Sequence, residues 1–293
     1  MSSSMMGRQI RSAVAIGLLV LVLLVIGQLL GGTNGVFIAL GIALVLNVVT
    51  YWYSDKIALM AHGARPADEL TYSSLHRIVG DLAQQAGIPK PKVYIIPTQS
   101  PNAFATGRDP AHASVAVTEG ILVLVDEREL RAVLAHELSH VTHRDILITT
   151  MATVIASAIF LLADWARWAL MWGGGRGRRD SGGVLQLVFL LVLLVVTPFA
   201  VMFLQAMLSQ NREYLADEGG ARLGHDPLAL ASALKKLDQW SRRVPMPASP
   251  AYSSLYIVHA SFGNFGGWFS THPPTAERIA RLEEMARTMS HLR

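Results

Sequence analysis

The chain has 293 residues, of which 52% are hydrophobic and only 16% are charged, against roughly 25% charged in an average soluble protein. It contains no cysteine, which excludes disulfide bonds, thiolate metal ligands and a cysteine nucleophile. The net charge of +4 is spread over arginines that flank apolar runs, and no basic patch with interleaved aromatic residues argues for nucleic acid. Anionic lipid headgroups are the simpler expected partner.

Apolar runs at four places predict membrane-spanning helices. No charged residue occurs between Ser12 and Ser54, where two uncharged runs, 12–30 and 35–53, are joined by a turn-like Gly-Gly-Thr-Asn. Each run approaches the ~20 residues that a helix needs to cross a bilayer. A cleaved signal peptide is the alternative for the first run, but its length and the second run close behind it disfavour that interpretation. Two further apolar segments, 146–163 and 184–208, complete the predicted set, and the Ser, Thr and Ala content of 146–163 leaves shielding by protein rather than lipid open for it.

The stretch between the second and third segments is polar enough to be soluble. A helix is predicted over 70–85 because Leu75, Ile78, Val79 and Leu82 recur at helical spacing. The short β-branched runs 92–96 and 114–118 predict strands. Residues 101–107 between them are interpreted as a loop, because turn residues stand at both ends.

The most informative motif is His136-Glu137-Leu138-Ser139-His140, in an amphipathic helix predicted over 127–143. Histidines at i and i+4 share one helical face, so both imidazoles can reach one metal ion. Glu137 would then address a water on that metal, whose pKa zinc lowers from 15.7 to roughly 7. The alternative is a chance match on a surface helix. The motif predicts a zinc-dependent peptidase with Glu137 as the general base.

A catalytic zinc usually has three protein ligands, so a third ligand is expected beyond the motif. The spacing that places another histidine six residues on fails, because Ile146 stands there. A later Glu-x-x-x-Asp pattern fits at Glu213 and Asp217. An antiparallel hairpin of the third and fourth segments would bring Glu213 back to the side of His140, and Asp217 would accept the free ring N–H of a ligating histidine. A solvated charged face is the alternative for this pair taken alone.

With these residues in place, the chain resembles the HtpX-type membrane zinc metalloproteases, relatives of the CAAX prenyl proteases. The resemblance covers nearly the whole chain and includes Asn-Ala-Phe-Ala-Thr-Gly at 102–107, Arg-Glu-Tyr-Leu-Ala-Asp at 212–217, Thr-His-Pro-Pro at 271–274 and Arg278. It implies one zinc ion held by His136, His140 and Glu213. It also implies an active site on the cytoplasmic face of a bacterial inner membrane, and a role in stress response through the degradation of damaged membrane proteins. His143 is treated as a surface residue.

Two elements of the resemblance predict roles beyond the metal. The segment Asn102, Ala103 and Phe104 leads to a possible edge strand that would bind an extended substrate peptide, with an ordinary loop as the alternative. His272 precedes two prolines and would donate a hydrogen bond to the developing oxyanion, with a helix-start histidine as the alternative. Residues 245–267 are predicted to form a long loop, and the aromatic residues from Tyr252 to Trp268 are expected to pack against the membrane surface, with a specific pocket as the alternative.

The predicted fold is a mostly α integral membrane protein with four transmembrane helices and a cytoplasmic α+β zincin-like (gluzincin) metalloprotease domain carrying a small β-sheet. Its predicted parts are an N-terminal hairpin at 1–54, a first protease part at 55–145, a second hairpin at 146–208 with a Gly/Arg linker at 173–183, and a second protease part at 209–293. Helices are predicted there over 209–223, 227–242 and 274–291.

Positive charges in the short loops favour a cytoplasmic active site, although the arginines at 176–179 conflict with that orientation. These arginines leave open whether the third and fourth apolar segments cross the membrane completely. The alternative functions are a prenyl-peptide processing protease and an inert membrane scaffold that retains the fold.

Overall fold

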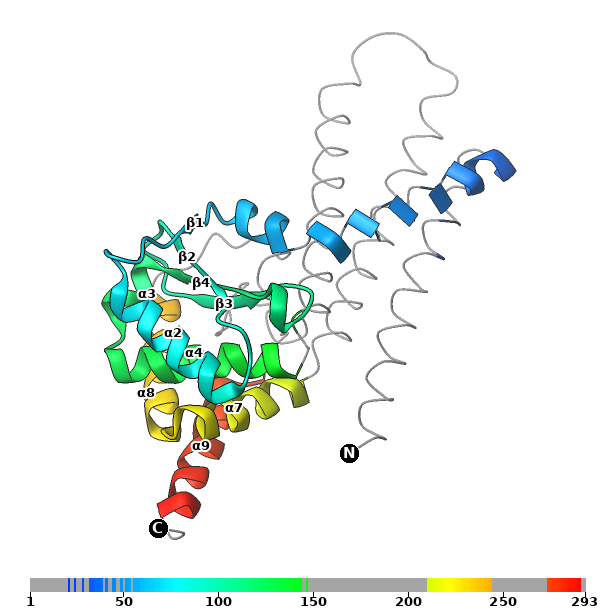
Figure 1. Ribbon diagram of the computed structural model, residues 1–293. Helices are drawn as coiled ribbons and strands as arrows, with labels where there is room; N and C mark the ends of the chain where they lie inside the picture. The colour runs from blue at the N-terminus through cyan, green and yellow to red at the C-terminus, as the bar shows by residue number, and fades with distance from the viewer. Residues whose placement is uncertain are drawn as a thin grey trace. The chain divides into compact units, whose positions relative to one another are not determined.

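The computed structural model describes residues 55–143, 210–243 and 273–290, together with Ile146 and separate pieces between 21 and 53 (Figure 1). The chain divides into two compact units, Met1–Thr50 with Ala152–Met207, and Tyr51–Met151 with Leu208–Arg293. The four apolar segments predicted to span a membrane lie wholly or partly outside the described residues. The linker 173–183, the loop 245–267 and His272 lie outside them too.

In the described part of the chain, none of the helices has both the length and the apolar character that a bilayer crossing requires.

A four-stranded mixed sheet forms one layer of the second unit. Its strands, in the order β1-β2-β4-β3, are β1 (Arg65–Pro66), β2 (Lys92–Ile96), β4 (Ser114–Thr118) and β3 (Ala103–Thr106). β2 and β4 run parallel, whereas β3 pairs antiparallel with β4 and forms the edge of the sheet. The predictions of strands at 92–96 and 114–118 are confirmed. The interpretation of 101–107 as a loop was wrong in part, because pairing with β4 makes a strand of residues that are weak strand formers alone.

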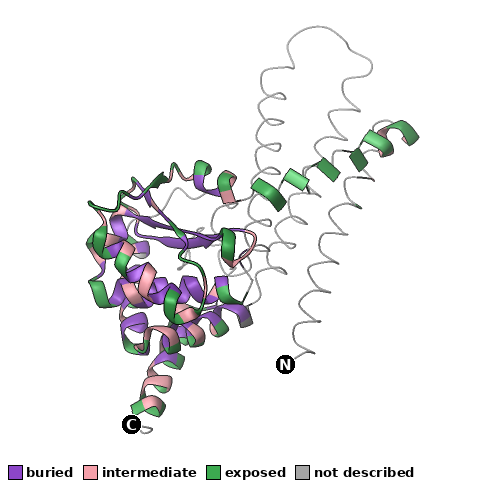
Figure 2. Cartoon of the chain, viewed as in Figure 1, coloured by how far each residue is buried: buried purple, intermediate pink, exposed green. Residues whose placement is uncertain are grey.

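The two faces of the sheet bury alternate residues, as the pleat of a strand requires. Val93, Ile95, Val115 and Val117 belong to the main core, shared with the helices on that side. Phe104 and two neighbouring strand residues, Ile96 and Ala116, face the other way and pack against Ala58 and Leu59. Figure 2 shows that β3 and β4 are buried, whereas β1 is exposed. β3 is therefore covered on both of its faces.

Three helices of this part have clear end signals. They are α2 (Ser73–Ala86), α3 (Glu119–Leu124) and α4 (Glu127–Thr142). α2 begins three residues later than predicted, because Asp68 accepts hydrogen bonds from the backbone and hydroxyl of Thr71 and holds this stretch in a turn. α4 starts at a capping box formed by Asp126 and Glu129, which satisfies backbone donors that the first helical turn leaves open.

Three later helices complete the unit around α4. They are α7 (Gln210–Gly224), α8 (Pro227–Arg243) and α9 (Thr275–Ser290), each within one residue of its predicted bounds at either end. α4 contacts α2, α7, α8 and β3, so it is the central helix of the unit (Figure 1). Buried Glu129 ties α4 to α8 by accepting hydrogen bonds from Lys236 Nζ and Ser232 Oγ, both at 2.6 Å.

Two adjacent glycines let α7 lie against the backbone of α4. A Cβ atom on Gly220 would lie 2.6 Å from the Cα of His136 and 2.7 Å from its nitrogen. A Cβ atom on Gly219 would lie 2.2 Å from the Oγ of Ser139. Since real Cβ atoms do not approach backbone so closely, only glycine allows this helix crossing. The crossing lies at the first histidine of the sequence motif.

We predict that Gly220→Ala lowers stability by about 1–3 kcal/mol, because the added methyl group forces α7 away from α4. Gly80→Ala in α2 is the matched control. A Cβ atom there meets only the Lys90 side chain at 3.9 Å, so removing a helical glycine should stabilise the chain by roughly 0.5–1 kcal/mol. Thermal unfolding of both variants in detergent checks this, and a midpoint that rises for both would contradict the close crossing.

Candidate metal centre

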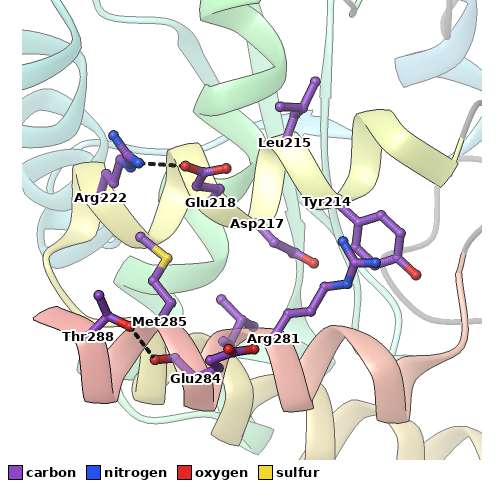
Figure 3. Close-up of a pocket in the computed structure, with 10 residues that line it drawn as sticks. Tyr214, Leu215, Asp217, Glu218, Arg222, Arg281, Glu284, Met285 and Thr288 are labelled. Atoms are coloured by element: carbon purple, nitrogen blue, oxygen red, sulfur yellow. Dashed lines mark hydrogen bonds and ion pairs between the residues drawn. The ribbon is translucent and has the colours of Figure 1, made fainter.

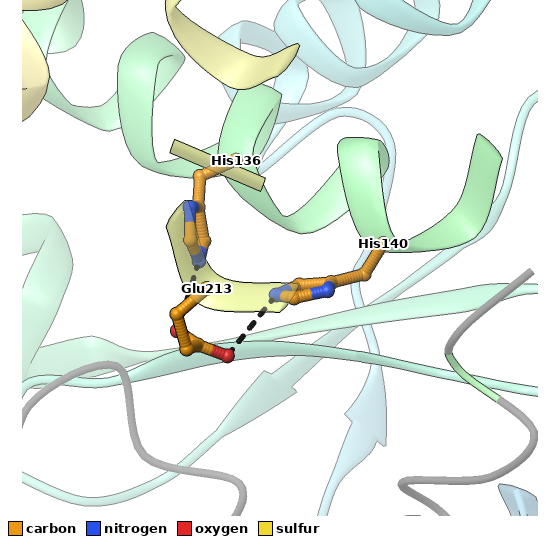
Figure 4. Close-up of side chains that lie close together, drawn as sticks. All are labelled: His136, His140 and Glu213. Carbon is orange, nitrogen blue, oxygen red and sulfur yellow. Dashed lines mark ion pairs between the residues drawn. The ribbon is translucent and has the colours of Figure 1, made fainter. Parts of the chain in front are cut away.

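His136, His140 and Glu213 bring three potential metal-ligand atoms together (Figure 4). The two histidines come from successive turns of α4, and Glu213 comes from the first turn of α7. Nε2 of His136 lies 3.7 Å from Oε2 of Glu213, and Nε2 of His140 lies 3.6 Å from Oε1. All three ligand atoms lie within 4.8 Å of one another. Glu213 is far from the histidine motif in sequence, but its side chain lies beside both motif histidines in the structure.

This donor set suits a zinc ion. Zinc binds imidazole nitrogen and carboxylate oxygen at about 2.0–2.2 Å, so tetrahedral ligand atoms lie roughly 3.3–3.6 Å apart. The separations between each histidine and the glutamate are close to that range. His136 and Glu213 are buried and the His140 side chain is 17% exposed, so the group is largely shielded from bulk water. Among the described residues, this is the one cluster of three such side chains close enough to hold an ion.

Two buried charged side chains, Asp217 and Arg278, contact the metal-binding group. Oδ1 of Asp217 lies 3.0 Å from Nδ1 of His136, on the side of the ring away from Glu213. Arg278, on α9, donates to both carboxylate oxygens of Asp217 at 2.7 and 2.8 Å and lies 3.6 Å from Oε2 of Glu213. Burial alone would raise the pKa of Asp217, but the Arg278 guanidinium and His136 hold it at about 2. Asp217 is therefore a carboxylate at neutral pH, able to accept the ring N–H that leaves Nε2 of His136 to a metal.

Glu137 follows His136 on α4 and contacts the sheet. Its Oε2 accepts a hydrogen bond of 3.0 Å from the backbone N–H of Ala105 in β3. Burial raises the pKa of Glu137 to about 7, although the neighbouring His136 charge acts in the opposite direction. A carboxyl group with this property can both take and return a proton near neutral pH.

The hydrogen bond from Ala105 also shows which residues of β3 turn their backbone groups away from β4. In an antiparallel pair, alternate residues turn their backbone groups toward and away from the partner strand. The carbonyl oxygen of Asn102 accepts from the N–H of Thr118, the last residue of β4, whereas the N–H of Ala105 points away from β4 and donates to Glu137. By this alternation, Ala103 also directs its backbone groups to the outer edge. The edge of the sheet that carries these groups is thus the one that Glu137 faces.

Comparison with known proteins places the chain in a family. Peptidase family M48 matches residues 69–286. Protease HtpX homolog of Pyrococcus abyssi is 49% identical over 97% of this chain and 98% of that protein. The homolog of Desulforapulum autotrophicum is 47% identical over 94% and 90%, respectively. The chain belongs to peptidase family M48.

As a member of this family, the chain is a metalloprotease, a hydrolase that cleaves peptide bonds. Its fold is also similar to the crystal structure of S. mikatae Ste24p, with a TM-score of 0.53 at 20% identity. That match covers 95% of this chain and 65% of the other. At this identity the likeness concerns the fold alone. The M48 fold of this chain is mostly helical, with a small mixed sheet.

Several other residues predicted to matter in this M48 chain do not belong to the three-residue cluster. His143 ends α4, where its Nδ1 lies 2.7 Å from the carbonyl oxygen of Ser139, and it is not part of the three-residue cluster. Asn102, Ala103 and Phe104 lie in and beside β3. Their predicted role and that of His272 stay predictions.

The sequence patterns give Arg278 no role beyond its part in the family resemblance. Its side chain is 1% exposed, and it lies one helical turn before buried Leu282 on α9. A signal was present, since Arg278 recurs at i, i+4 and i+7 spacing with Leu282 and Met285, on the apolar stripe of the predicted helix. An arginine on such a stripe indicates a buried carboxylate partner.

We predict that Arg278→Gln destabilises the M48 domain by about 3–5 kcal/mol, because removing one partner leaves the Asp217 charge buried and unpaired. Arg287→Gln, on the exposed side of the same helix, is the control and should change stability by less than about 0.5 kcal/mol. Urea unfolding of both variants measures the difference. Equal free energies of unfolding for the two variants would show that the Arg278–Asp217 ion pair makes no net contribution to stability.

A groove of about 630 Å³ lies on the α9 side of α7 (Figure 3). Arg281 lies over the ring of Tyr214, 3.6 Å from its centroid, and Asp217 lines the groove from α7. Neither motif histidine nor Glu137 lines it. The groove is therefore distinct from the metal group.

Proposed function

We propose that this M48 member is a zinc-dependent endopeptidase of the plasma membrane that cleaves misfolded or damaged membrane proteins at the cytoplasmic face. One observation carries the proposal of its chemistry. Glu137 lies beside the His136–His140–Glu213 cluster and at the same time contacts the outer edge of β3 through Ala105. A peptide paired with that edge would have its backbone next to both the base and the metal.

In this mechanism, His136, His140 and Glu213 hold the zinc ion, and Asp217 fixes the tautomer of His136. Zinc, when bound, lowers the pKa of a coordinated water and polarises the substrate carbonyl. Glu137 takes the proton of the attacking water on Oε1 while Oε2 keeps the hydrogen bond from Ala105. It then returns this proton to the amine of the leaving peptide, so that one water is consumed for each bond broken.

The substrate is proposed to bind as an added strand along β3, with Asn102, Ala103 and Phe104 as its site. Main-chain hydrogen bonds supply affinity in this mode without requiring one side-chain sequence. That suits an enzyme whose substrates are damaged proteins of many sequences. The edge position of β3 and the outward direction of Ala103 support the proposal.

His272 is proposed to donate a hydrogen bond to the oxyanion. We predict that His272→Ala lowers kcat with little change in KM or zinc content, because such a donor acts mainly in the transition state. Loss of one donor of this kind costs roughly 10²–10³-fold in kcat. Steady-state kinetics on a quenched fluorescent peptide, with metal analysis of the same sample, make the test. An unchanged kcat would return His272 to a structural role.

The membrane location rests on the apolar segments 12–30, 35–53, 146–163 and 184–208, taken as four helices. In this arrangement, 1–54 and 146–208 are two transmembrane hairpins, and 55–145 and 209–293 together form the cytoplasmic protease domain. The count of arginines and lysines in short loops supports the cytoplasmic side.

Single cysteines at Ser73 and Ser181 test this orientation in a chain that has no cysteine of its own. Ser73 lies exposed at the start of α2. An impermeant maleimide applied to intact cells should label Ser181→Cys, whereas Ser73→Cys should react only after the membrane is opened. Labelling of Ser73→Cys alone in intact cells would overturn the cytoplasmic active site.

A further inference from the structure

A group of aromatic and cationic side chains lies at the start of the second unit. Tyr51, Trp52 and Tyr53 are about half exposed, at 42%, 52% and 50%. The Nζ of Lys56 lies 5.3 Å from the centroid of the Tyr53 ring, and the Cζ of Arg108 lies 4.8 Å from that of Trp52. We call these five residues the aromatic–cationic cluster.

The chemistry of this cluster is that of a membrane interface. Tyrosine and tryptophan combine an apolar ring with a polar tip and favour the headgroup level of a bilayer. Lysine and arginine near that level attract anionic headgroups. Asp109 is an acidic neighbour, with Oδ2 3.5 Å from Nε of Arg108. Within the described ranges, no carboxylate forms an ion pair with Lys56, so its charge is available to a ligand.

The cluster is attached to the edge strand at two points. Arg108 follows two residues after Thr106, the last residue of β3. On the other side, the helical turns that follow Tyr53 pack Ala58 and Leu59 against Phe104 of β3. A ligand that holds the cluster therefore also holds β3.

We propose that the aromatic–cationic cluster binds anionic phospholipid headgroups and so fixes the β3 edge at the membrane surface. The proposal rests on the membrane location proposed above and names the lipid class and the residues. A lipid fits better than a free phosphate, because half-exposed rings need an apolar partner beside the anion. The uncharged stretch of sequence that ends at Ser54 also places the cluster where the chain leaves its apolar run. Peptides close to the membrane surface would thereby reach β3 first.

The test uses the full chain in lipid nanodiscs that contain phosphatidylcholine and phosphatidylglycerol. A single cysteine at Met60, 74% exposed and one helical turn after Lys56, carries an environment-sensitive fluorophore. Spin-labelled phosphatidylglycerol should quench it at least about twofold more than spin-labelled phosphatidylcholine at the same fraction, because cations enrich anionic lipid locally. This preference should disappear in Lys56→Gln/Arg108→Gln. It should persist in Lys235→Gln/Arg287→Gln, which removes the same charge from the α8–α9 face.

The outcomes separate the lipid site from the membrane location. Equal quenching by both lipids, or quenching by neither, in a parent protein that co-elutes with the nanodiscs would overturn the lipid site and keep the membrane location. A parent protein that does not enter the nanodiscs would overturn both. A preference that survives in the double variant, or that millimolar inorganic phosphate abolishes, would also overturn the lipid site. Should the double variant unfold, Lys56→Gln alone replaces an exposed side chain, and it should reduce the preference.

Discussion

Replacing Glu137 with glutamine is expected to abolish proteolysis while zinc remains bound. Glutamine keeps the size of the side chain and can still accept the hydrogen bond from Ala105, but it cannot take a proton from water. Loss of a general base typically lowers the rate by ~10²–10⁴-fold. Initial rates of casein cleavage and the zinc content of the same preparation should be measured together.

Glu127→Gln is the control for this experiment, since Glu127 lies exposed at the start of the same helix and pairs with Arg77. It should keep both the activity and the metal. A Glu137→Gln protein that cleaves casein at nearly the rate of the parent would rule out Glu137 as the base.

The second expected result concerns the metal. His136→Ala, His140→Ala and Glu213→Ala should each lose zinc and activity, because each removes one of three protein ligands. His143→Ala should keep both, although His143 lies only three residues from His140, since its ring contacts the end of α4 instead. Metal content by mass spectrometry measures the difference.

Asp217→Asn should lower zinc affinity by ~10–100-fold rather than abolish binding, because Asp217 contacts a ligand and not the metal. A Glu213→Ala protein with normal zinc content would mean that the third ligand lies elsewhere in the chain.

Local sequence patterns predicted most of the described secondary structure. The helix of the histidine motif was predicted at 127–143 and spans Glu127–Thr142. The β-branched runs at β2 and β4 are strands with the predicted bounds. These elements were predictable because their periodicity and end signals lie within the element itself.

The strand β3 was expected only through the family resemblance, as a possible edge strand, whereas the local residue pattern predicted a loop, because the stability of this strand comes from elsewhere. Ala103 and Ala105 have little intrinsic preference for a strand, and turn residues precede and follow them. Their strand conformation depends on pairing with Val117 and Val115 of β4, which no pattern within 101–107 reveals. The contact of Ala105 with Glu137 depends in turn on that pairing.

The grouping of Glu213 with the two histidines followed from a known motif spacing, but the reasons for its geometry did not. Gly220 brings the α7 backbone against His136, and Arg278 balances the charge of Asp217. Both contacts join residues far apart in sequence. A glycine pair in a helix and an arginine on an apolar stripe were visible, but the partner of each could only be found in three dimensions.

The most direct test of the account is metal analysis of the detergent-purified chain together with casein cleavage before and after treatment with a chelator. If His136, His140 and Glu213 hold a catalytic zinc ion, the protein contains one zinc per chain, loses activity with the metal and regains it when zinc is returned. Casein cleavage that continues at its full rate after all the metal has been removed would contradict the account.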